Sequence, residues 1–368
     1  MKKNFTLLFL VFTSIIFSQA GAPAEPYYNG FNWTLTGMSL KSALATKITT
    51  THTNLIPYVW NATQATDIDP NNANNVLLIY GFSNNTCPTS ISDGNDHRSR
   101  NIFSNGGGNS CEWNREHVYA KSLGTPQLVD GATSSADSDA GEDAHNLRAC
   151  DVDRNNNRGS LKFAPGTGNS GNVTGGWYPG NEWKGDVARM MMYMYLRYPT
   201  QCLPINVGTG TTVSNDPNMI QLFLQWNSED PVSPYEDNRN TYHGNTSNTY
   251  AQGNRNPFID NPYLATVIWG GPAAQNRWPT IFLSAENFIS IENASVFPNP
   301  AINNEVFIST KSELKSIVIY NINGQIIQEI KNPSRINETY KVSNLPKGFY
   351  LVQLASENES ITKKIMVN

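Results

Sequence analysis

The side chains best suited to chemistry lie close together in residues 111–122, which read Cys-Glu-Trp-Asn-Arg-Glu-His-Val-Tyr-Ala-Lys-Ser. This run predicts a short strand that carries a carboxylate, Glu116, next to an imidazole, His117. Neighbouring residues on a strand point to opposite faces of the sheet. We therefore expect the two side chains to do different work in one place, the carboxylate holding a metal ion and the imidazole facing a water molecule.

A second segment, residues 143–159, reads Asp-Ala-His-Asn-Leu-Arg-Ala-Cys-Asp-Val-Asp-Arg-Asn-Asn-Asn-Arg-Gly. It is rich in amide oxygens and guanidinium groups. A hard cation prefers oxygen ligands, and a phosphodiester is well matched by arginine. Taken with the first segment, this composition predicts a metal-dependent nuclease.

Other catalytic chemistries fit the sequence less well. Zinc could use His117, His145 and a carboxylate, but the chain has no His-Glu-x-x-His motif. One Glu, one Asn and water suit Mg²⁺ or Ca²⁺ better. The chain has neither the Gly-x-Ser-x-Gly motif of a serine hydrolase nor a Gly-x-x-x-x-Gly-Lys phosphate loop. The acidic residues of 124–142 lack the spacing of an EF-hand, so we expect a solvated loop there.

Length and composition set bounds on the function. The chain has 368 residues, enough for two domains, and a formal net charge of −4 at pH 7. A net negative charge argues against a protein that coats nucleic acid, but an enzyme needs to grip only a few phosphates. We expect the cysteines to form disulfides, with free thiols as the alternative, and the pairing stays open. No two of the four have Cys-x-x-Cys spacing: Cys87, Cys111, Cys150 and Cys202.

The N-terminus predicts export. Lys2 and Lys3 precede a short apolar run, residues 7–17, and the small residues Ser18 and Ala20 follow. This is the pattern of a cleavable signal peptide over residues 1–20. The apolar run is too short to span a bilayer comfortably, and no later run reads as a membrane helix. We therefore expect a soluble mature protein outside the cytoplasm.

The spacing of apolar residues predicts helices over residues 34–52, 183–198 and 219–227. The helix at 183–198 is the clearest, because Met and aromatic residues recur at three and four residues and a proline ends it. The continuous apolar run 75–81 predicts a buried strand. We expect ordinary surface or packing roles for three histidines without a suggestive neighbour: His52, His97 and His243.

From Pro272 the composition changes, and from Ser295 short apolar segments alternate with turns. The dipeptide Asn323-Gly324 is a strong hairpin signal. This pattern predicts a small all-β module of the sandwich type. We expect a first domain over residues 21–271, a linker over 272–293 and a second domain over 294–368.

Several separated motifs within residues 25–270 resemble the bacterial endonuclease I family, in the order in which the family has them. They are Asn114-Arg115-Glu116-His117, Asp143-Ala144-His145-Asn146-Leu147, Asn155-Asn156-Asn157-Arg158, Lys184-Gly185-Asp186-Val187-Ala188-Arg189 and Gln252-Gly253-Asn254-Arg255-Asn256-Pro257.

The resemblance implies a ββα-metal (His-Me finger) site in which His117 is the general base. It implies that Glu116 and Asn155 hold the metal, Mg²⁺ or else Ca²⁺ or Mn²⁺. Asn146 and His145 are expected as supporting residues, with Asn146 as the alternative ligand.

The chain departs from the family's pattern in two places. Ala149 and Cys150 follow the His-Asn-Leu segment, where the family usually has proline or a small polar residue. Some members place a phosphate-steadying arginine between the two half-motifs, and residues 123–143 hold none. We assign Arg158 to the catalytic site in its stead. The further phosphate-binding candidates are Arg115, Arg148 and Arg154.

The C-terminal module resembles a type A sorting domain. The motifs are Val296-Phe297-Pro298-Asn299-Pro300, Tyr320-Asn321-Ile322-Asn323-Gly324, Leu345-Pro346-Lys347-Gly348-Phe349-Tyr350-Leu351-Val352 and Lys363-Lys364-Ile365-Met366-Val367. In the Bacteroidota such domains route proteins through the type IX secretion system. The resemblance implies that this machinery is a partner, and that the protein is released from a Gram-negative cell or anchored at its surface. A β-sandwich that binds a ligand is the alternative.

The sequence thus predicts an α+β fold, with a ββα-metal (His-Me finger) nuclease domain that has several helices, followed by a small all-β sandwich domain. We expect a secreted endonuclease that hydrolyses DNA, and RNA as a further substrate, with little sequence specificity. The resemblance implies products with 5′-phosphate ends. We expect a monomer without membrane insertion. The alternatives are an extracellular ribonuclease and a non-catalytic surface protein that binds nucleic acid or glycan.

Overall fold

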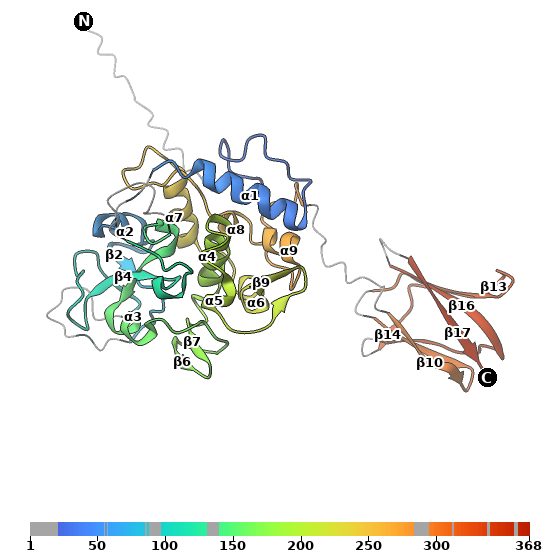
Figure 1. Cartoon of the computed structure of the whole chain (residues 1–368). Helices are drawn as coiled ribbons and strands as arrows, with labels where there is room; N and C mark the ends of the chain where they lie inside the picture. Colours follow the sequence, from blue (N-terminus) through green and yellow to red (C-terminus); the bar gives the residue numbers. More distant parts are fainter. Residues whose placement is uncertain are drawn as a thin grey trace, which may run out of the picture. The chain divides into compact units, whose positions relative to one another are not determined.

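The computed structural model describes residues 21–54, 56, 58–84, 87, 97–130, 140–282, 294–310, 313–336, 339–356 and 360–368. The chain divides into two compact units, Met1–Leu283 and Ser284–Asn368 (Figure 1). The expected signal peptide, residues 1–20, lies outside the described residues. Each unit has a hydrophobic core of its own.

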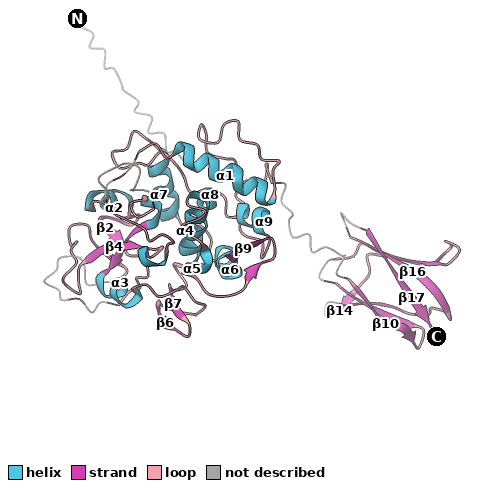
Figure 2. Cartoon of the chain, in the orientation of Figure 1, coloured by secondary structure: helices cyan, strands magenta, loops and turns pink. Residues whose placement is uncertain are grey.

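Helices predominate in the first unit (Figure 2). The helices expected at 34–52, 183–198 and 219–227 are present as α1, α4 and α6, with slightly different ends. The α-helices are α1 Gly37–Thr51, α2 Trp60–Thr66, α3 Val152–Arg158, α4 Lys184–Arg197, α5 Pro204–Val207, α6 Gln221–Glu229, α7 Pro234–Gly244, α8 Pro257–Asp260 and α9 Tyr263–Trp269. Two short 3₁₀ helices, η1 Lys121–Leu123 and η2 Ala144–Asn146, lie between β4 and β5 in the sequence.

Helix α4 forms the centre of this unit, and every residue from Gly185 to Leu196 is buried. Its apolar side chains explain that burial, but Asp186 and Arg189 are buried with them. Their charges are compensated from other elements, since Arg189 pairs with Glu236 at 2.6 Å and Asp186 pairs with Arg148 at 3.1 Å. A helix that is enclosed on all sides in this way requires paired charges, because an isolated buried charge is very costly.

The strands of the first unit form small sheets. The antiparallel pair β4–β5 is the one that carries the predicted site, and β1–β2–β3 form a three-stranded sheet. The strands are β1 Ile68–Asp69, β2 Asn72–Leu77, β3 Ser99–Asn101, β4 Trp113–His117, β5 Leu147–Asp151, β6 Gly171–Val173, β7 Gly176–Tyr178, β8 Thr212–Val213 and β9 Asp216–Ile220.

The first unit extends further along the chain than the sequence predicted. Trp278 is 2% exposed and belongs to the same core as α4. Arg277 donates hydrogen bonds to Asp237 and to the carbonyl oxygen of Ile259. Residues 272–282 therefore pack on the first unit, where we expected a linker. The rest of that expected linker, residues 283–293, lies outside the described residues.

The second unit consists of strands in its described part (Figure 2). They are β10 Ser295–Ile302, β11 Glu305–Ser309, β12 Ser316–Asn321, β13 Ile326–Lys331, β14 Arg335–Ile336, β15 Thr339–Val342, β16 Gly348–Ala355 and β17 Ser360–Val367. Their order is β13-β12-β16-β17-β10-β11-β15-β14. Strand β10 pairs with β11 and also with β17, so it belongs to both halves of the sheet. The turn at Asn323-Gly324 joins β12 to β13 as the sequence predicted.

Alternating burial along these strands encloses the second core. In β11 and β12, Val306, Ile308, Ile317 and Ile319 are fully buried while their neighbours are partly exposed. This period of two is the one expected for strands with one face on a core. None of the described helices in either unit is both long and apolar enough to cross a membrane.

Candidate active site

Strands β4 and β5 and helix α3 form a continuous ββα unit. The strands pair antiparallel, from Trp113 opposite Asp151 to His117 opposite Leu147. Helix α3 starts at Val152, directly after β5, because the Asp151 side chain accepts hydrogen bonds from the first backbone N–H groups of the helix. This is the strand–strand–helix arrangement that the resemblance implied.

The two faces of β4 have different neighbours. Asn114 and Glu116 face α3, where Asn114 bonds to Asn155 and Glu116 pairs with Arg158. Arg115 and His117 contact Tyr58, whose ring lies outside the ββα unit. The expected division of Glu116 and His117 between opposite faces is therefore present.

Glu116 is buried, with 3% of its surface exposed. The Tyr80 hydroxyl donates to Oε1 at 3.1 Å, and Arg158 Nη1 donates to the same oxygen at 3.1 Å. Burial raises the pKa of Glu116 to about 7, although the Arg158 charge and these hydrogen bonds oppose the rise. Because both donors use Oε1, the second oxygen, Oε2, is the one suited to a cation.

The imidazole of His117 is held in its neutral form. Its Nε2 donates to the carbonyl oxygen of Gly141 at 2.7 Å, so the proton resides on Nε2 and Nδ1 carries the lone pair. Burial lowers the pKa of His117 to about 4, against the opposing effects of this hydrogen bond and of Asp130. Asp130 lies 3.9 Å from Nε2 and pairs with Lys121. At neutral pH the ring is therefore uncharged and able to accept a proton.

Asn155 lies on α3 and is half-buried. Its Nδ2 donates to Oδ1 of Asn114 at 2.7 Å, which leaves the amide oxygen of Asn155 for another partner. Among the described residues, no group of three or more His, Cys, Asp or Glu side chains could hold a metal ion. One carboxylate, one amide oxygen and water are oxygen donors of the kind that Mg²⁺ and Ca²⁺ bind. The donor set of Glu116 and Asn155 fits such an ion and does not fit zinc.

Asn146 and His145, the expected supporting residues, are engaged with other residues of the first unit. The Asn146 side chain accepts from the backbone N–H of Tyr119 at 2.7 Å and donates to the Tyr119 carbonyl at 3.2 Å. Both amide atoms are thus engaged in joining the end of β4 to the start of β5. His145 is 2% exposed and lies against Tyr193, inside the core.

The structure corrects two of the expected roles for arginine. Arg148 is 1% exposed and pairs with Asp186 and Asp67, so it stabilises the core and does not contact phosphate. Arg158 is also 1% exposed. It donates to Glu116 and to the carbonyl oxygens of His117 and Val118, and it therefore positions β4 rather than touching the substrate.

The two remaining candidates are more accessible. The Arg115 guanidinium carbon lies 3.6 Å from the centre of the Tyr58 ring and 4.1 Å from that of Trp60. Arg154 lies on α3 with its guanidinium over the ring of Phe82, at 4.1 Å. Both side chains are half-buried, and phosphate binding by either stays a prediction.

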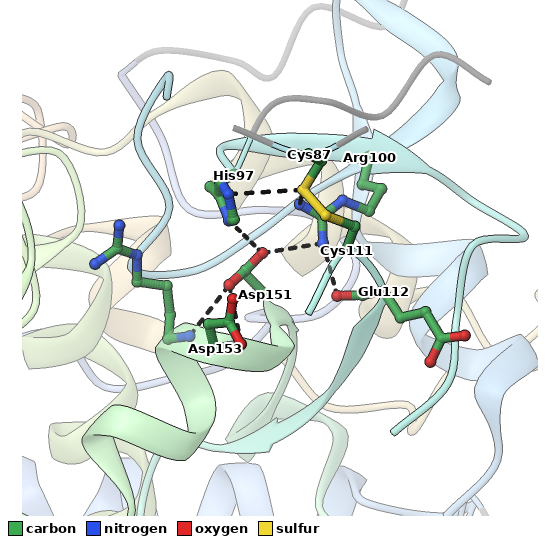
Figure 3. The surroundings of a disulfide bond; sticks show 8 residues. Cys87, His97, Arg100, Cys111, Glu112, Asp151 and Asp153 are labelled. Carbon is green, nitrogen blue, oxygen red and sulfur yellow. Dashed lines mark hydrogen bonds and ion pairs between the residues drawn. A yellow bond between two sulfur atoms is a disulfide. The ribbon is translucent and has the colours of Figure 1, made fainter. Parts of the chain in front are cut away.

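A buried cluster supports the N-terminus of α3 (Figure 3). Asp151 Oδ2 receives His97 Nδ1 at 2.6 Å and Arg100 Nη1 at 2.9 Å. Arg100 also donates to Sγ of Cys87, which forms a disulfide with Cys111. The other cysteines, Cys150 and Cys202, are buried thiols.

Sequence reasoning missed several members of this site. His97 is 6% exposed and bonded to Asp151, so it has a defined structural role that its neighbours in sequence did not indicate. Tyr58 and Tyr80 come from segments well before β4. Asn114 was within reach of prediction, because on a strand it shares a face with Glu116.

Comparisons with known proteins agree with this geometry. The endonuclease I family profile matches residues 36–263, and the profile of the secretion system C-terminal sorting domain matches residues 295–368. An extracellular ribonuclease of Bacillus subtilis (strain 168) is 40% identical over 265 residues, covering 67% of this chain and 82% of that protein. An extracellular ribonuclease of Bacillus amyloliquefaciens is 37% identical over 259 residues, covering 67% and 79%.

Among solved structures, one of PorZ, a surface component of the type-IX secretion system of Porphyromonas gingivalis, has 16% sequence identity and a TM-score of 0.19. The match covers 23% of this chain and 13% of that chain.

Proposed function

The chain belongs to the endonuclease I family, and from that premise we propose that it is a metal-dependent endonuclease that hydrolyses DNA with little sequence specificity. It is a secreted or cell-surface nuclease, since residues 295–368 match a secretion sorting domain and the two Bacillus relatives are named as extracellular ribonucleases. Nucleic acid is the substrate, and the C-terminal unit is the part that a secretion machinery recognises. We expect the protein to contact phosphates rather than base edges, and phosphate contacts carry no sequence information, so specificity should be low.

The observation that carries the proposal is the state of His117. The Gly141 carbonyl fixes the proton on Nε2, so Nδ1 is the atom that takes a proton from the attacking water. A pKa of about 4 keeps the ring neutral before the reaction. The water then attacks phosphorus in line with the leaving 3′ oxygen, and the bond between phosphorus and that oxygen breaks. The leaving oxygen takes a proton from solvent water, so the products carry 5′-phosphate and 3′-hydroxyl ends.

Glu116 and Asn155 are the residues that would hold Mg²⁺, or Ca²⁺ or Mn²⁺ in its place. When bound, such an ion stabilises the charge that grows on the phosphate and on the leaving oxygen. Arg158 and Tyr80 orient the Glu116 carboxylate, and the Asn114 amide orients Asn155.

Replacing the general base tests this mechanism. General acid–base catalysis contributes about 10²–10⁴-fold, so His117→Ala should lose that much of kcat while the protein stays folded. Free imidazole added to the variant should restore part of the rate, because it supplies the missing base. A matched control is Tyr263→Ala, a half-buried ring on α9. Wild-type rates in purified His117→Ala would contradict the role of His117.

A second candidate is an extracellular ribonuclease. It is favoured by a specific observation, namely that both Bacillus relatives are named as extracellular ribonucleases. The same base and the same donor set would serve, since water attack on phosphorus does not require the 2′-hydroxyl. The ratio of cleavage rates on plasmid DNA and on structured RNA decides between the two.

A further inference from the structure

Tyr58 and Trp60 form a cradle for Arg115 on the face of β4 that carries His117. The guanidinium carbon of Arg115 lies 3.6 Å from the Tyr58 ring centre and 4.1 Å from the Trp60 ring centre. Nη1 of Arg115 also donates to the Tyr58 carbonyl at 2.5 Å. Trp60 is itself packed edge-on against Trp113, with ring centres 5.5 Å apart. The planar cation is thus fixed by two rings and a backbone oxygen.

The charge of Arg115 has no carboxylate partner among the ion pairs of the described residues. Other arginines of the first unit do have one: Arg98, Arg100, Arg148, Arg158, Arg189, Arg239, Arg255 and Arg277. Asp130, the carboxylate that acts on Arg115 electrostatically, is paired with Lys121 at 2.8 Å. The Nε of Arg115 is buried without a hydrogen-bond partner. Buried donors are normally satisfied, so this one is suited to an anion that arrives with a ligand.

Tyr58 also contacts the general base. Its ring centre lies 5.1 Å from that of His117, with the ring planes tilted by 36°. Arg115 and His117 are two residues apart on one face of β4, which separates them by about 6.7 Å along the strand. At that separation we expect the two side chains to serve different phosphates of the substrate.

We propose that Arg115, held in this cradle, binds the phosphate next to the one that is cleaved, and that Tyr58 is the positioning residue that keeps Arg115 and His117 in one arrangement. The inference rests on the proposed nuclease function and adds a second phosphate subsite to it. The ring of Tyr58 is the essential part, since its hydroxyl makes only a 3.4 Å contact with the Arg115 carbonyl.

The test compares Tyr58→Ala, Tyr58→Phe, Arg115→Ala and the double variant Tyr58→Ala/Arg115→Ala in the full chain. Small misplacements in an active site cost up to about 10²-fold, so Tyr58→Ala should lower kcat/KM by about 10- to 100-fold. Tyr58→Phe keeps the ring and should stay within about threefold of wild type. In the Arg115→Ala background, the further loss from Tyr58→Ala should be smaller than in the wild-type background, because the part of the loss that acts through Arg115 is already present.

Equilibrium binding of a duplex oligonucleotide in EDTA provides a readout that does not depend on cleavage. Arg115→Ala should reduce the slope of log K against log salt by about 0.9, the value for one lost phosphate contact. Tyr58→Ala should reduce the slope by a smaller amount, and Tyr263→Ala should not change it.

The phosphate subsite would be overturned if the losses of kcat/KM from Tyr58→Ala and Arg115→Ala were fully additive. It would also be overturned if Arg115→Ala left the salt slope unchanged. Failure of the wild-type protein to cleave any nucleic acid would overturn the proposed function instead, and the slopes in EDTA would still report on the cradle. Thermal unfolding of each variant shows whether a loss of activity or of binding reflects loss of the fold.

Discussion

Glu116 and His117 are adjacent and both buried, yet their surroundings prepare them for different tasks. Burial disfavours the charged form of either side chain, which raises the pKa of an acid and lowers that of a base. The pKa of Glu116 is raised to about 7, with burial opposed by Arg158, and burial lowers that of His117 to about 4. Near neutral pH the base is neutral, while the carboxyl titrates and a nearby cation would favour its ionised form.

Arg158 provides a direct test of this balance. Arg158→Ala would remove a buried cationic donor from Glu116, which keeps the Tyr80 hydroxyl, and from two backbone carbonyls. Breaking a buried ion pair by removing one partner typically costs 3–5 kcal/mol, so we expect the free energy of unfolding to fall by about 3 kcal/mol or more. Urea titration followed by tryptophan fluorescence measures it, because every tryptophan of the chain precedes residue 279.

The matched control for Arg158 is Arg154→Ala on the same helix, whose side chain is half-buried. It should change stability much less. If Arg158→Ala unfolded at the wild-type urea concentration but bound nucleic acid weakly, Arg158 would be a phosphate ligand after all.

At the scale of elements, α3 is the part that must be placed correctly, since it carries both Asn155 and Arg158. Its first turn is fixed by Asp151, which caps the helix and faces Arg100 and His97 in the cluster of Figure 3. Capping contributes about 1 kcal/mol, and we expect the buried ionic contacts with Arg100 and His97 to add to it, because loss of one partner of a buried ion pair is costly. Arg100 also donates to Cys87, so the cluster connects the start of α3 to the Cys87–Cys111 disulfide.

Asp151→Asn tests the charge of Asp151 separately from its capping role, because asparagine is also a good helix cap. Burial alone would raise the pKa of Asp151, but the His97 hydrogen bond and the Arg100 charge hold it below its ordinary value. A lowered pKa stabilises the fold above the pKa of the unfolded chain, and that contribution is lost as pH falls.

We expect Asp151→Asn to lower the free energy of unfolding by about 3 kcal/mol at pH 7, because Arg100 loses its buried partner. The difference from wild type should shrink as pH falls below about 4, because the unfolded wild-type chain then binds a proton at Asp151 that the folded chain does not bind until lower pH. Urea titrations at several pH values measure it. A difference that stayed constant down to acid pH would contradict the ionic role.

Local sequence was sufficient for some elements and not for others. The alternation of Glu116 and His117, the stripe on α4 and the Asn323-Gly324 turn depend on near neighbours, and these predictions are confirmed. The roles of Arg148 and His97 depend on partners far away in the chain, so spacing could not reveal them.

At the scale of the whole molecule, the candidate site and the C-terminal strands belong to two units, each with its own hydrophobic core. The core around α4 and that of β10–β17 have no residue in common. The sorting domain matches residues 295–368, which lie entirely within the second unit. Each unit is therefore expected to fold with its own cooperativity.

Removing the second unit tests this independence. A chain that stops after Leu283 should keep kcat/KM on nucleic acid within about a factor of two, since no site residue lies beyond that point. Its tryptophan-monitored urea transition should match that of the full chain. A large loss of activity in a truncated protein that remains folded would show that the second unit contributes to the site.

In the proposed mechanism, His117 and one bound divalent cation together promote hydrolysis of phosphodiester bonds. The most direct measurement incubates the mature protein with supercoiled plasmid and, separately, with structured RNA, in Mg²⁺, in Ca²⁺ or in EDTA. We expect cleavage that EDTA abolishes, and the two rates identify the preferred polymer. Cleavage that continues in EDTA would contradict the proposed requirement for a metal ion. Binding without cleavage under every condition would contradict the proposed enzymatic activity.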